Sequence, residues 1–532
     1  MRRIPLIAIV LCLVLVLPAL AQGPKVVTLD SPAPLVQIRV LVKAGSASDP
    51  AGKEGLARLT GQMLIQGGFG DAKAPITKEK LAEITRPWGD DAYPSVSVSK
   101  EITVFTMTVP REVLSTYISQ VFQPLFTQPL LDAKELDRVR GETLQTLRSN
   151  LRLEQIELVG LVALDNVIHE GTSYAHPDIG TEKGLEAVTV EDVRSFYASY
   201  YAADHVVLGV STSDPTIAGQ LRDVLAKMSP GDEQSWMRKR IAASPAVKGR
   251  EVTIVALPNA ISTGLHAGFP LPVTRTDADY WPLYVANIWF GTHRDSFGHL
   301  YSTIRADRGY NYGDYSYVEH FEARPFVMFP PPNTPRRYQY FSIWLRPVQN
   351  EYAYHLMKAL TWELENFVRT GLTEDQCEQA KNKAKVLYLS LAETGSRLLA
   401  TRLDDEFYGM SPGYLDGYLK SIDGVTCTAM NAAIRKYLQA ENLKYVVVTS
   451  KAMAPKLVEQ IAGNAPAWGK PPADYQIDSK QEGGEKVYVV PERKLNLLQR
   501  DAAWAYYALD IPRARIHIAP AEKMFETAAL PK

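Results

Sequence analysis

Two residues in the second half of the chain could together donate hydrogen bonds to an oxygen that carries negative charge. Arg305 presents several N–H donors in a fixed fork, and Tyr312, seven residues later, presents one O–H donor. Arg305 ends a predicted helix, Gly309 fits the position just beyond a helix C-terminus, and Tyr312 is expected on the next strand. The structural alternative is a helix-end arginine near one of four strand tyrosines that pack on a sheet, namely Tyr310, Tyr312, Tyr315 and Tyr317.

The histidines do not form a pattern that would bind a metal ion. Two histidines that share a zinc ion on one helix face stand four residues apart. His169 and His176 are instead seven residues apart in a polar stretch, and the other histidines are scattered. We therefore expect surface or loop histidines and no metal site in this chain.

The elements that would position these residues occur twice along the chain. Three pairs of segments repeat at offsets of 237, 239 and 241 residues. They are the helices that follow Val188 and Val425, the strands 206–211 and 445–450, and the helices that follow Leu131 and Leu372. Such self-similarity indicates two copies of one structural plan.

This duplication predicts two similar halves, at 22–228 and 251–465, joined by a polar linker at 229–250 and followed by an extension at 466–532. Strand-like and helical spacings mix in each half without a strict β-α-β alternation. This pattern favours an α+β fold, in which each half is a mainly antiparallel sheet with helices packed on one face. The sequence does not indicate a role for the extension.

Composition and charge exclude two broad classes of protein. The chain is 46% hydrophobic and 22% charged, which is typical of a globular protein and not of a disordered one. Its 58 basic and 59 acidic residues leave a net charge of −1, so we expect no nucleic-acid partner held by bulk charge.

The N-terminus has the form of a secretory signal peptide. Arg2 and Arg3 precede an apolar run over 4–17, and an A-x-A pattern ends at Ala21. The run is shorter than the ~20 residues that span a bilayer. We expect cleavage after residue 21 and no membrane span in the mature chain. The expected address is the periplasm or, alternatively, the exterior, and an uncleaved anchor is the remaining alternative.

Two cysteines, Cys377 and Cys427, remain after such cleavage. They could pair in an oxidising compartment. Their spacing matches no disulfide pattern, so the sequence leaves the pairing open.

Three segments resemble the inverted zinc metallopeptidases, the insulinase/pitrilysin/mitochondrial processing peptidase family. They are 44–67, 173–185 and 291–317, and the likeness extends over about 26–460. The resemblance implies a clamshell whose two parts face each other across a cavity. It also implies that Arg305 grips the substrate backbone and that the Tyr312 hydroxyl helps to hold the developing oxyanion.

The segment 44–67 departs from this family at the zinc motif. The family's helix carries H-x-x-E-H. The resemblance places Arg58 at the first histidine, Gly61 at the glutamate base and Gln62 at the second histidine. It places Thr146 at the third zinc ligand, with Glu142 as the nearest carboxylate. A guanidinium repels a divalent cation and glutamine is a poor zinc ligand, so we expect no zinc in this chain.

The resemblance implies a function because some family members divide the clamshell between two chains, only one of which keeps the zinc motif. We expect the non-zinc subunit of an exported heterodimeric zinc metallopeptidase, inactive alone. Its partner would be a zinc-bearing chain and its substrate a peptide. The alternative is a catalytically inactive homologue that acts as a peptide-binding or scaffold protein, and a third hypothesis is a zinc peptidase with unusual ligands.

The substitutions also yield two structural predictions. A buried, unpaired charge is unfavourable, so we expect Arg58 to contact a carboxylate, Glu142 before any other. Gly61 within a helix is less favourable than alanine by about 1 kcal/mol, which suggests that another element packs closely there or that the position drifted after catalysis was lost.

Overall fold

The computed structural model describes residues 23–229, 243–321, 333–470, 480–482, 485–487 and 491–531. The predicted signal peptide and most of the predicted linker lie outside the described residues. Among the described helices, none is long and apolar enough to cross a membrane.

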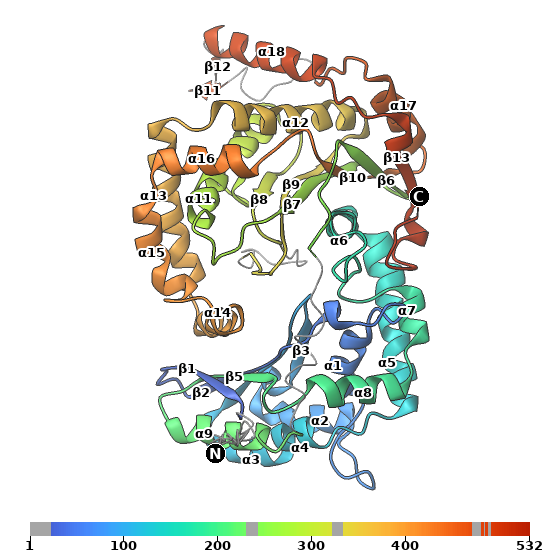
Figure 1. Ribbon diagram of the computed structural model, residues 1–532, viewed down its shortest axis with the longest axis vertical. Coiled ribbons are helices and arrows are strands. Elements are labelled where there is room, and N and C mark those ends of the chain that lie inside the picture. Colours follow the sequence, from blue (N-terminus) through green and yellow to red (C-terminus); the bar gives the residue numbers. More distant parts are fainter. Residues whose placement is uncertain are drawn as a thin grey trace, which may run out of the picture.

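Each half contains one sheet (Figure 1), and the second sheet repeats the strand order of the first and adds one strand, β13, at its edge. The first runs β1 (Lys25–Leu29), β5 (Val206–Ser211), β2 (Leu35–Val42), β4 (Thr103–Pro110), β3 (Ser95–Val98). The second runs β13 (Ile516–Pro520), β6 (Glu251–Leu257), β10 (Lys444–Ser450), β7 (Thr263–Leu271), β9 (Gln339–Val348), β8 (Asp314–Tyr317). Pairing is antiparallel except for β1 with β5 and β6 with β10 and β13. The predicted α+β fold of two similar halves is confirmed.

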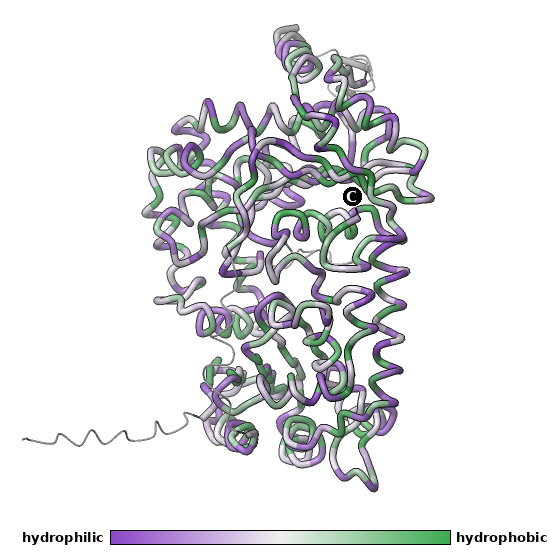
Figure 2. The backbone as a smooth tube through the Cα atoms, turned by 45° about the vertical axis from the view of Figure 1, so that its right-hand side comes forward, coloured by the Kyte–Doolittle hydropathy of each residue, from purple (hydrophilic) through white to green (hydrophobic). Residues whose placement is uncertain are grey.

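Helices from the same half cover one face of each sheet. In the first half they are α1 (Leu56–Gln66), α2 (Lys78–Thr85), α3 (Leu114–Tyr117), α4 (Gln123–Thr127), α5 (Ala133–Thr146), α7 (Glu182–Ala187), α8 (Val190–Tyr200) and α9 (Pro215–Leu225). In the second they are α11 (Tyr280–Gly291), α12 (Ala353–Thr370), α13 (Glu374–Leu391), α15 (Tyr414–Gly424), α16 (Cys427–Tyr437) and α17 (Ala454–Gly463). The outer helices alternate hydrophilic and hydrophobic segments, as expected when one face packs on a core (Figure 2).

The sequence repeat corresponds to equivalent helix starts. α8 and α16 begin after Thr189 and Thr426, and each threonine side chain accepts a hydrogen bond from a backbone N–H of the first turn. α5 and α13 begin in the same way after Asp132 and Thr373. Such caps satisfy N–H groups that a helix leaves unpaired, so each duplicated helix retained a capping residue at its start.

The other face of each sheet is covered by a helix from the opposite half. α6 (Ile156–Ile168) of the first half packs on β7 and β10 of the second sheet. α14 (Gly395–Tyr408) of the second half packs on β1 and β5 of the first sheet. The two helices follow the equivalent long helices α5 and α13, so the exchange is reciprocal. Strand β5 is buried throughout because both of its faces are covered.

Glycines allow these exchanged helices to approach closely. A methyl group on Gly160 of α6 would overlap the buried His266 ring of β7. A methyl group on Gly209 of β5 would lie 2.9 Å from the Leu403 side chain of α14. Close packing of the two halves therefore depends on glycine, which has no side chain, at these two positions.

Buried charges also join the halves. Lys100, in the turn between β3 and β4, has its Nζ 3.1 Å from Asp178 Oδ1 and 3.5 Å from Asp165 Oδ2. Arg336 of the second half donates to Asp165 Oδ1 at 2.9 Å. Burial alone would raise the pKa of Asp165, but Arg336 and Lys100 hold it well below its usual value.

The C-terminal extension packs on both halves. α18 (Pro491–Tyr506) lies along α12, where the buried Trp504 donates to Glu363 Oε1 at 3.0 Å. β13 adds a sixth strand to the second sheet beside β6. The chain then reaches the first half, where Asn166 donates to the Ala528 carbonyl at 2.8 Å. The extension thus connects the two halves, a role that the sequence did not reveal.

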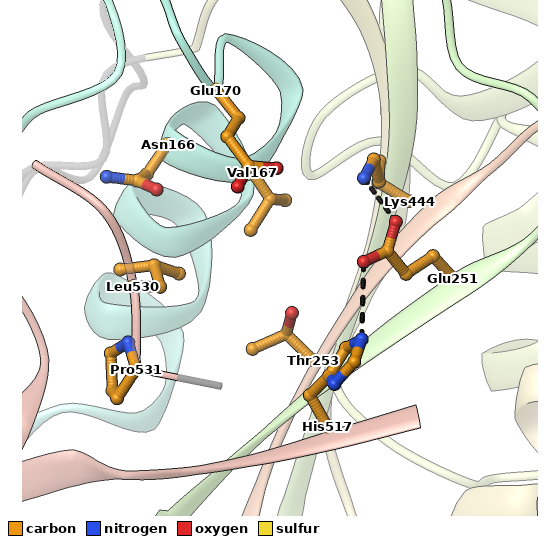
Figure 3. A pocket seen from close by; sticks show the side chains of 9 residues that line it. All are labelled: Asn166, Val167, Glu170, Glu251, Thr253, Lys444, His517, Leu530 and Pro531. Atoms are coloured by element: carbon orange, nitrogen blue, oxygen red, sulfur yellow. Dashed lines mark hydrogen bonds and ion pairs between the residues drawn. The ribbon is translucent and has the colours of Figure 1, made fainter. Parts of the chain in front are cut away.

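The last described residues border a small pocket where the two halves meet, a contact region called the seam below (Figure 3). Leu530 and Pro531 lie beside α6, across from Glu251 of β6. Glu251 pairs with Lys444 of β10 and lies 3.5 Å from His517 Nε2 of β13. The pocket is therefore formed where α6, β6, β10 and the C-terminal extension meet.

Cys377 and Cys427 form a disulfide that joins the first turns of α13 and α16. Both residues are buried in the second core. The pairing that the sequence left open is thus present in the structure.

We expect Gly160→Ala to lower the free energy of unfolding by about 1–3 kcal/mol, because the added methyl overpacks the contact between α6 and β7. Gly219→Ala is the matched control, since Gly219 also lies in a helix but faces open space. It should raise that free energy by up to about 1 kcal/mol. Denaturant unfolding of both variants measures the changes. A stabilising Gly160→Ala would contradict the close approach of α6.

We expect the double variant Cys377→Ala, Cys427→Ala to lose about 4 kcal/mol of stability on the chain-entropy model, because the bridge spans 50 residues. Denaturant unfolding of the oxidised chain and the variant measures the loss. Equal stability, together with two titratable thiols in the unfolded wild-type chain, would show that the cysteines are not paired.

Candidate functional site

Arg305 and Tyr312 lie side by side just before the start of β8. Arg305 belongs to η7 (Tyr301–Ala306), and its carbonyl accepts the N–H of Gly309 at 2.7 Å. Gly309 has a positive φ of 65°, as predicted for a residue beyond a helix C-terminus. Tyr312 is not on a strand, because the chain bends there, two residues before β8 begins.

The Arg305 guanidinium lies between two aromatic rings. Its Cζ is 4.6 Å from the centroid of Tyr301 and 5.5 Å from that of Tyr312. Tyr312 is 76% exposed, whereas Tyr310, Tyr315 and Tyr317 are buried. Three of the four tyrosines therefore pack in the protein, and Tyr312 presents its ring to the outside beside a cation. Stacking on aromatic faces restrains a guanidinium and leaves its N–H edge available.

A buried carboxyl lies beneath this pair. Asn311 Nδ2 donates to Asp314 Oδ1 at 2.7 Å and to the Arg346 carbonyl at 3.0 Å. Asp314 Oδ2 is buried without a hydrogen-bond partner among the described residues. Burial raises the pKa of Asp314 well above its usual value, and the Asn311 hydrogen bond and the Arg305 charge oppose the shift only partly. The Asp314 carboxyl therefore takes up a proton more readily than an exposed aspartate does.

Sequence reasoning missed Asp314, Asn311 and Tyr301. A polar residue two positions after Tyr312 carries no sign of its burial, because the bend that turns it inward is set by the pairing of β8 with β9. The aromatic residue at the start of η7, four positions before Arg305, is the one signal that was available.

The helix assigned to the zinc motif is α1. Arg58 and Gln62 stand one turn apart on its less buried face. Gly61 faces the sheet, where a methyl group would lie 3.1 Å from Val96 Cγ2 and 3.4 Å from Thr103 Cγ2. Close packing at Gly61, one of the two explanations that the sequence suggested, is thus present.

Gln62 contacts α5 through Thr143. The Thr143 Oγ1 lies 3.0 Å from Gln62 Oε1 and 2.8 Å from the Val139 carbonyl. Thr146, which the resemblance placed at the third ligand, is exposed, and its hydroxyl bonds to the Glu142 carbonyl at 3.0 Å. Thr143 therefore occupies the place opposite Gln62 that was expected for Thr146. In the described parts of the chain, no group of three histidine, cysteine or carboxylate side chains is arranged to hold a metal ion.

The expected pairing of Arg58 with Glu142 is wrong. Glu142 is exposed and pairs with Arg138, one turn earlier on α5, at 2.8 Å and with Lys78 at the start of α2 at 3.6 Å. Arg58 Nε is buried without a hydrogen-bond partner among the described residues. Burial lowers the pKa of Arg58, and Asp178 is the carboxylate that opposes this shift.

His169 and His176 follow the end of α6 in a loop, one of the two expected settings, but both are buried and neither lies at the surface. His169 Nε2 is 3.4 Å from Asp165 Oδ1, and His176 Nδ1 is 3.0 Å from the Pro177 carbonyl. Burial lowers the pKa of His176 to about 4, so this histidine is neutral near pH 7. Both belong to the seam between the halves, which their polar sequence context concealed.

Comparison with known families identifies the relatives of this chain. A model described as insulinase (peptidase family M16) matches residues 25–165, and one described as peptidase M16 inactive domain matches 187–384. The chain belongs to the insulinase family. The inactive-domain match covers the segment that holds Arg305 and Tyr312.

Individual relatives of this insulinase-family chain are distant in sequence. YmxG of Bacillus subtilis, described as an uncharacterized zinc protease, is 23% identical over 352 residues, which are 64% of this chain and 76% of that protein. A peptidase M16 inactive domain from Pseudomonas fluorescens is 21% identical with a TM-score of 0.67, over 81% of this chain and 96% of that one. The first half of the periplasmic protease PqqL from Escherichia coli is 13% identical with a TM-score of 0.59, over 90% and 95%. These structural likenesses support the shared fold.

We expect Asp314→Asn to change how stability depends on pH. A carboxyl whose folded pKa is raised contributes its full stability below its unfolded pKa of about 3.9 and loses it as pH rises toward the folded pKa. The wild-type chain should therefore lose stability above about pH 4 relative to the variant, by at most about 1.4 kcal/mol per pH unit. Denaturant unfolding between pH 4 and about pH 8 measures this difference.

Glu112→Gln, which alters an exposed carboxylate, is the control and should show no such difference. Parallel pH profiles for the wild-type chain and Asp314→Asn would contradict a raised pKa of Asp314.

Proposed function

We propose that this chain is the non-zinc subunit of an exported heterodimeric zinc metallopeptidase. The observation that carries the proposal is the Arg305–Tyr312 pair, in which an exposed tyrosine lies beside a cation that makes no ion pair with a described residue. Such a pair can donate several hydrogen bonds to one peptide carbonyl and its developing oxyanion. The zinc ion that activates water belongs to a partner chain of the same family.

The residues of α1 support the proposal that the catalytic groups are distributed over two chains. Arg58, Gly61 and Gln62 supply neither a zinc ligand set nor a general base. This chain contributes the Arg–Tyr contacts and part of the chamber wall, and it has no peptidase activity alone. If no zinc-bearing partner exists, the same features support a peptide-binding or scaffold protein.

Export to an oxidising compartment is part of the proposal. The N-terminal sequence predicts a signal peptide, and the buried Cys377–Cys427 disulfide suits such a compartment. The relative PqqL is described as a periplasmic protease. We place this chain in the periplasm, with secretion as the alternative.

We expect the tagged chain, purified gently from its host, to carry a second chain of similar size and to cleave peptides. A zinc chelator should abolish the cleavage. A single chain without cleavage in the eluate would contradict the subunit proposal and favour the scaffold function.

In that complex, we expect Arg305→Ala and Tyr312→Phe each to lower kcat/KM by about 100- to 1,000-fold, as is usual when one oxyanion donor is removed. Tyr506→Phe, at an exposed tyrosine on α18, is the matched control and should leave kcat/KM unchanged. Steady-state cleavage of a fluorogenic peptide measures these effects. Wild-type kcat/KM in both site variants would contradict the assigned roles.

A further inference from the structure

The segment between Arg305 and Tyr312 sets the geometry of this pair. Tyr312 is 76% exposed and lies in a bend of the chain, so core packing does not fix its ring. The Arg305 Cζ nevertheless lies 5.5 Å from the centroid of that ring. The spacing of the two side chains therefore depends on the backbone of 306–311, which must hold one conformation if both donors are to meet one oxygen.

The two ends of this segment are fixed within the second half. At the first end, Ile304 of η7 is buried in the second core. At the other end, Asn311 Nδ2 donates to the Arg346 carbonyl of β9 at 3.0 Å. The middle of the segment, 308–310, is held by the C-terminal extension.

Arg308 joins the middle of the segment to α18. Its side chain is fully buried, and its Nε donates to Asp501 Oδ1 at 2.7 Å. Its Cζ lies 4.3 Å from the centroid of the Trp504 ring, and its Nη1 donates to the Thr303 carbonyl of η7 at 2.6 Å. One guanidinium therefore binds η7 and α18 together, through hydrogen bonds that its charge strengthens.

A second contact joins the extension to the next two residues of the segment. The Lys470 backbone N–H donates to the Tyr310 hydroxyl at 2.9 Å, and the Lys470 Nζ donates to the Gly309 carbonyl at 2.6 Å. A methyl group on Gly469 would lie 1.7 Å from the Tyr310 hydroxyl oxygen. The extension can therefore approach Tyr310 this closely only with glycine at position 469.

The extension is itself anchored on a long helix of the second half. α18 lies along α12 (Figure 1), and its buried Trp504 donates to Glu363 Oε1 of α12 at 3.0 Å. The other oxygen of Glu363 lies 2.7 Å from His299 Nε2. The extension thus links the position of α12 to that of the segment 308–310.

We propose that Asp501 and Lys470 of the C-terminal extension are positioning residues for the Arg305–Tyr312 pair. They act through the segment 308–310, which they hold at three successive residues. The extension is therefore needed for the arrangement of the two donors. That these donors act on a peptide rests on the proposed function, whereas the positioning follows from contacts within this chain.

The first test uses the full chain without a partner, with Tyr312 replaced by 3-fluorotyrosine. The ¹⁹F resonance reports the electric field at this ring, so Arg305→Gln, which removes the neighbouring cation, gives a reference shift. We expect Asp501→Asn to move the resonance toward this reference or to split it. Removal of the carboxylate charge drives the buried Arg308 toward water, and Arg308 displaces the segment 308–310 as it moves.

Matched variants separate this effect from a general loss of stability. Glu319 Oε1 accepts from the Arg275 Nε at 2.8 Å, so Glu319→Gln also removes one carboxylate charge from a buried ion pair of the second half. It should lower stability and leave the resonance in place. Gly469→Ala alters the second contact without a change of charge and should move the resonance. Gly463→Ala, at a glycine that faces open space, should not.

The second test measures cleavage by the complex. Asp501→Asn should lower kcat/KM by about 10- to 100-fold, because a displacement of about 1 Å in an active site can cost that much. The loss should be smaller in a complex that already carries Tyr312→Phe, since substitutions that act through one group are not additive. A merely structural role would give the same loss in both backgrounds. Glu319→Gln should leave kcat/KM unchanged.

An unmoved, single resonance in folded Asp501→Asn would overturn the proposal, and Gly469→Ala decides in the same way if Asp501→Asn does not fold. Equal losses of kcat/KM in the wild-type and Tyr312→Phe backgrounds would overturn it as well. Because the resonance needs neither a partner nor cleavage, the absence of a zinc-bearing chain would contradict the proposed function alone.

Discussion

The reciprocal exchange of helices α6 and α14 is the constraint on which the rest of the structure depends. Each sheet has two apolar faces, and each half supplies helices for only one of them. The second face is covered by the helix that the other half extends, so neither half could bury its strands alone. The two halves therefore pack together as one unit, and this packing positions the residues at the strand ends.

The charges at the seam follow from this exchange. Asp165 of α6 and His169, which follows α6, lie against the second half, where Arg336 pairs with Asp165. The loop after α6 places Asp178 beside Lys100 of the first half. Buried charges are tolerated only when they are paired. Arg58 lies at the margin of this cluster. It is influenced by the charge of Asp178, which also pairs with Lys100. The position assigned to a zinc ligand thus adjoins the network that joins the halves.

Much of the fold and part of the site were predictable from the sequence. The helix starts and strand runs that repeat near an offset of 240 residues correspond to equivalent elements, and Gly309 ends η7 as expected. Side-chain partners were less predictable. Arg58 was expected at Glu142, but Glu142 is engaged by Arg138 and Lys78 on the exposed side of α5. Thr143 faces Gln62 in place of Thr146, because the register of α5 against α1 is set by the whole helix interface.

The sequence by itself determined the duplicated α+β plan, the presence of Arg58, Gly61 and Gln62 in the helix that resembles the family's zinc-motif helix, and the presence of an arginine and a tyrosine seven residues apart in the second half. These properties are local, since they depend on hydrophobic period, capping residues and side-chain chemistry. Only the tertiary structure decided which of four tyrosines is exposed, that Asp314 lies buried beneath Arg305, and that Cys377 meets Cys427. Burial and pairing depend on residues far apart in the chain, and the packing of two halves around exchanged helices brings them together.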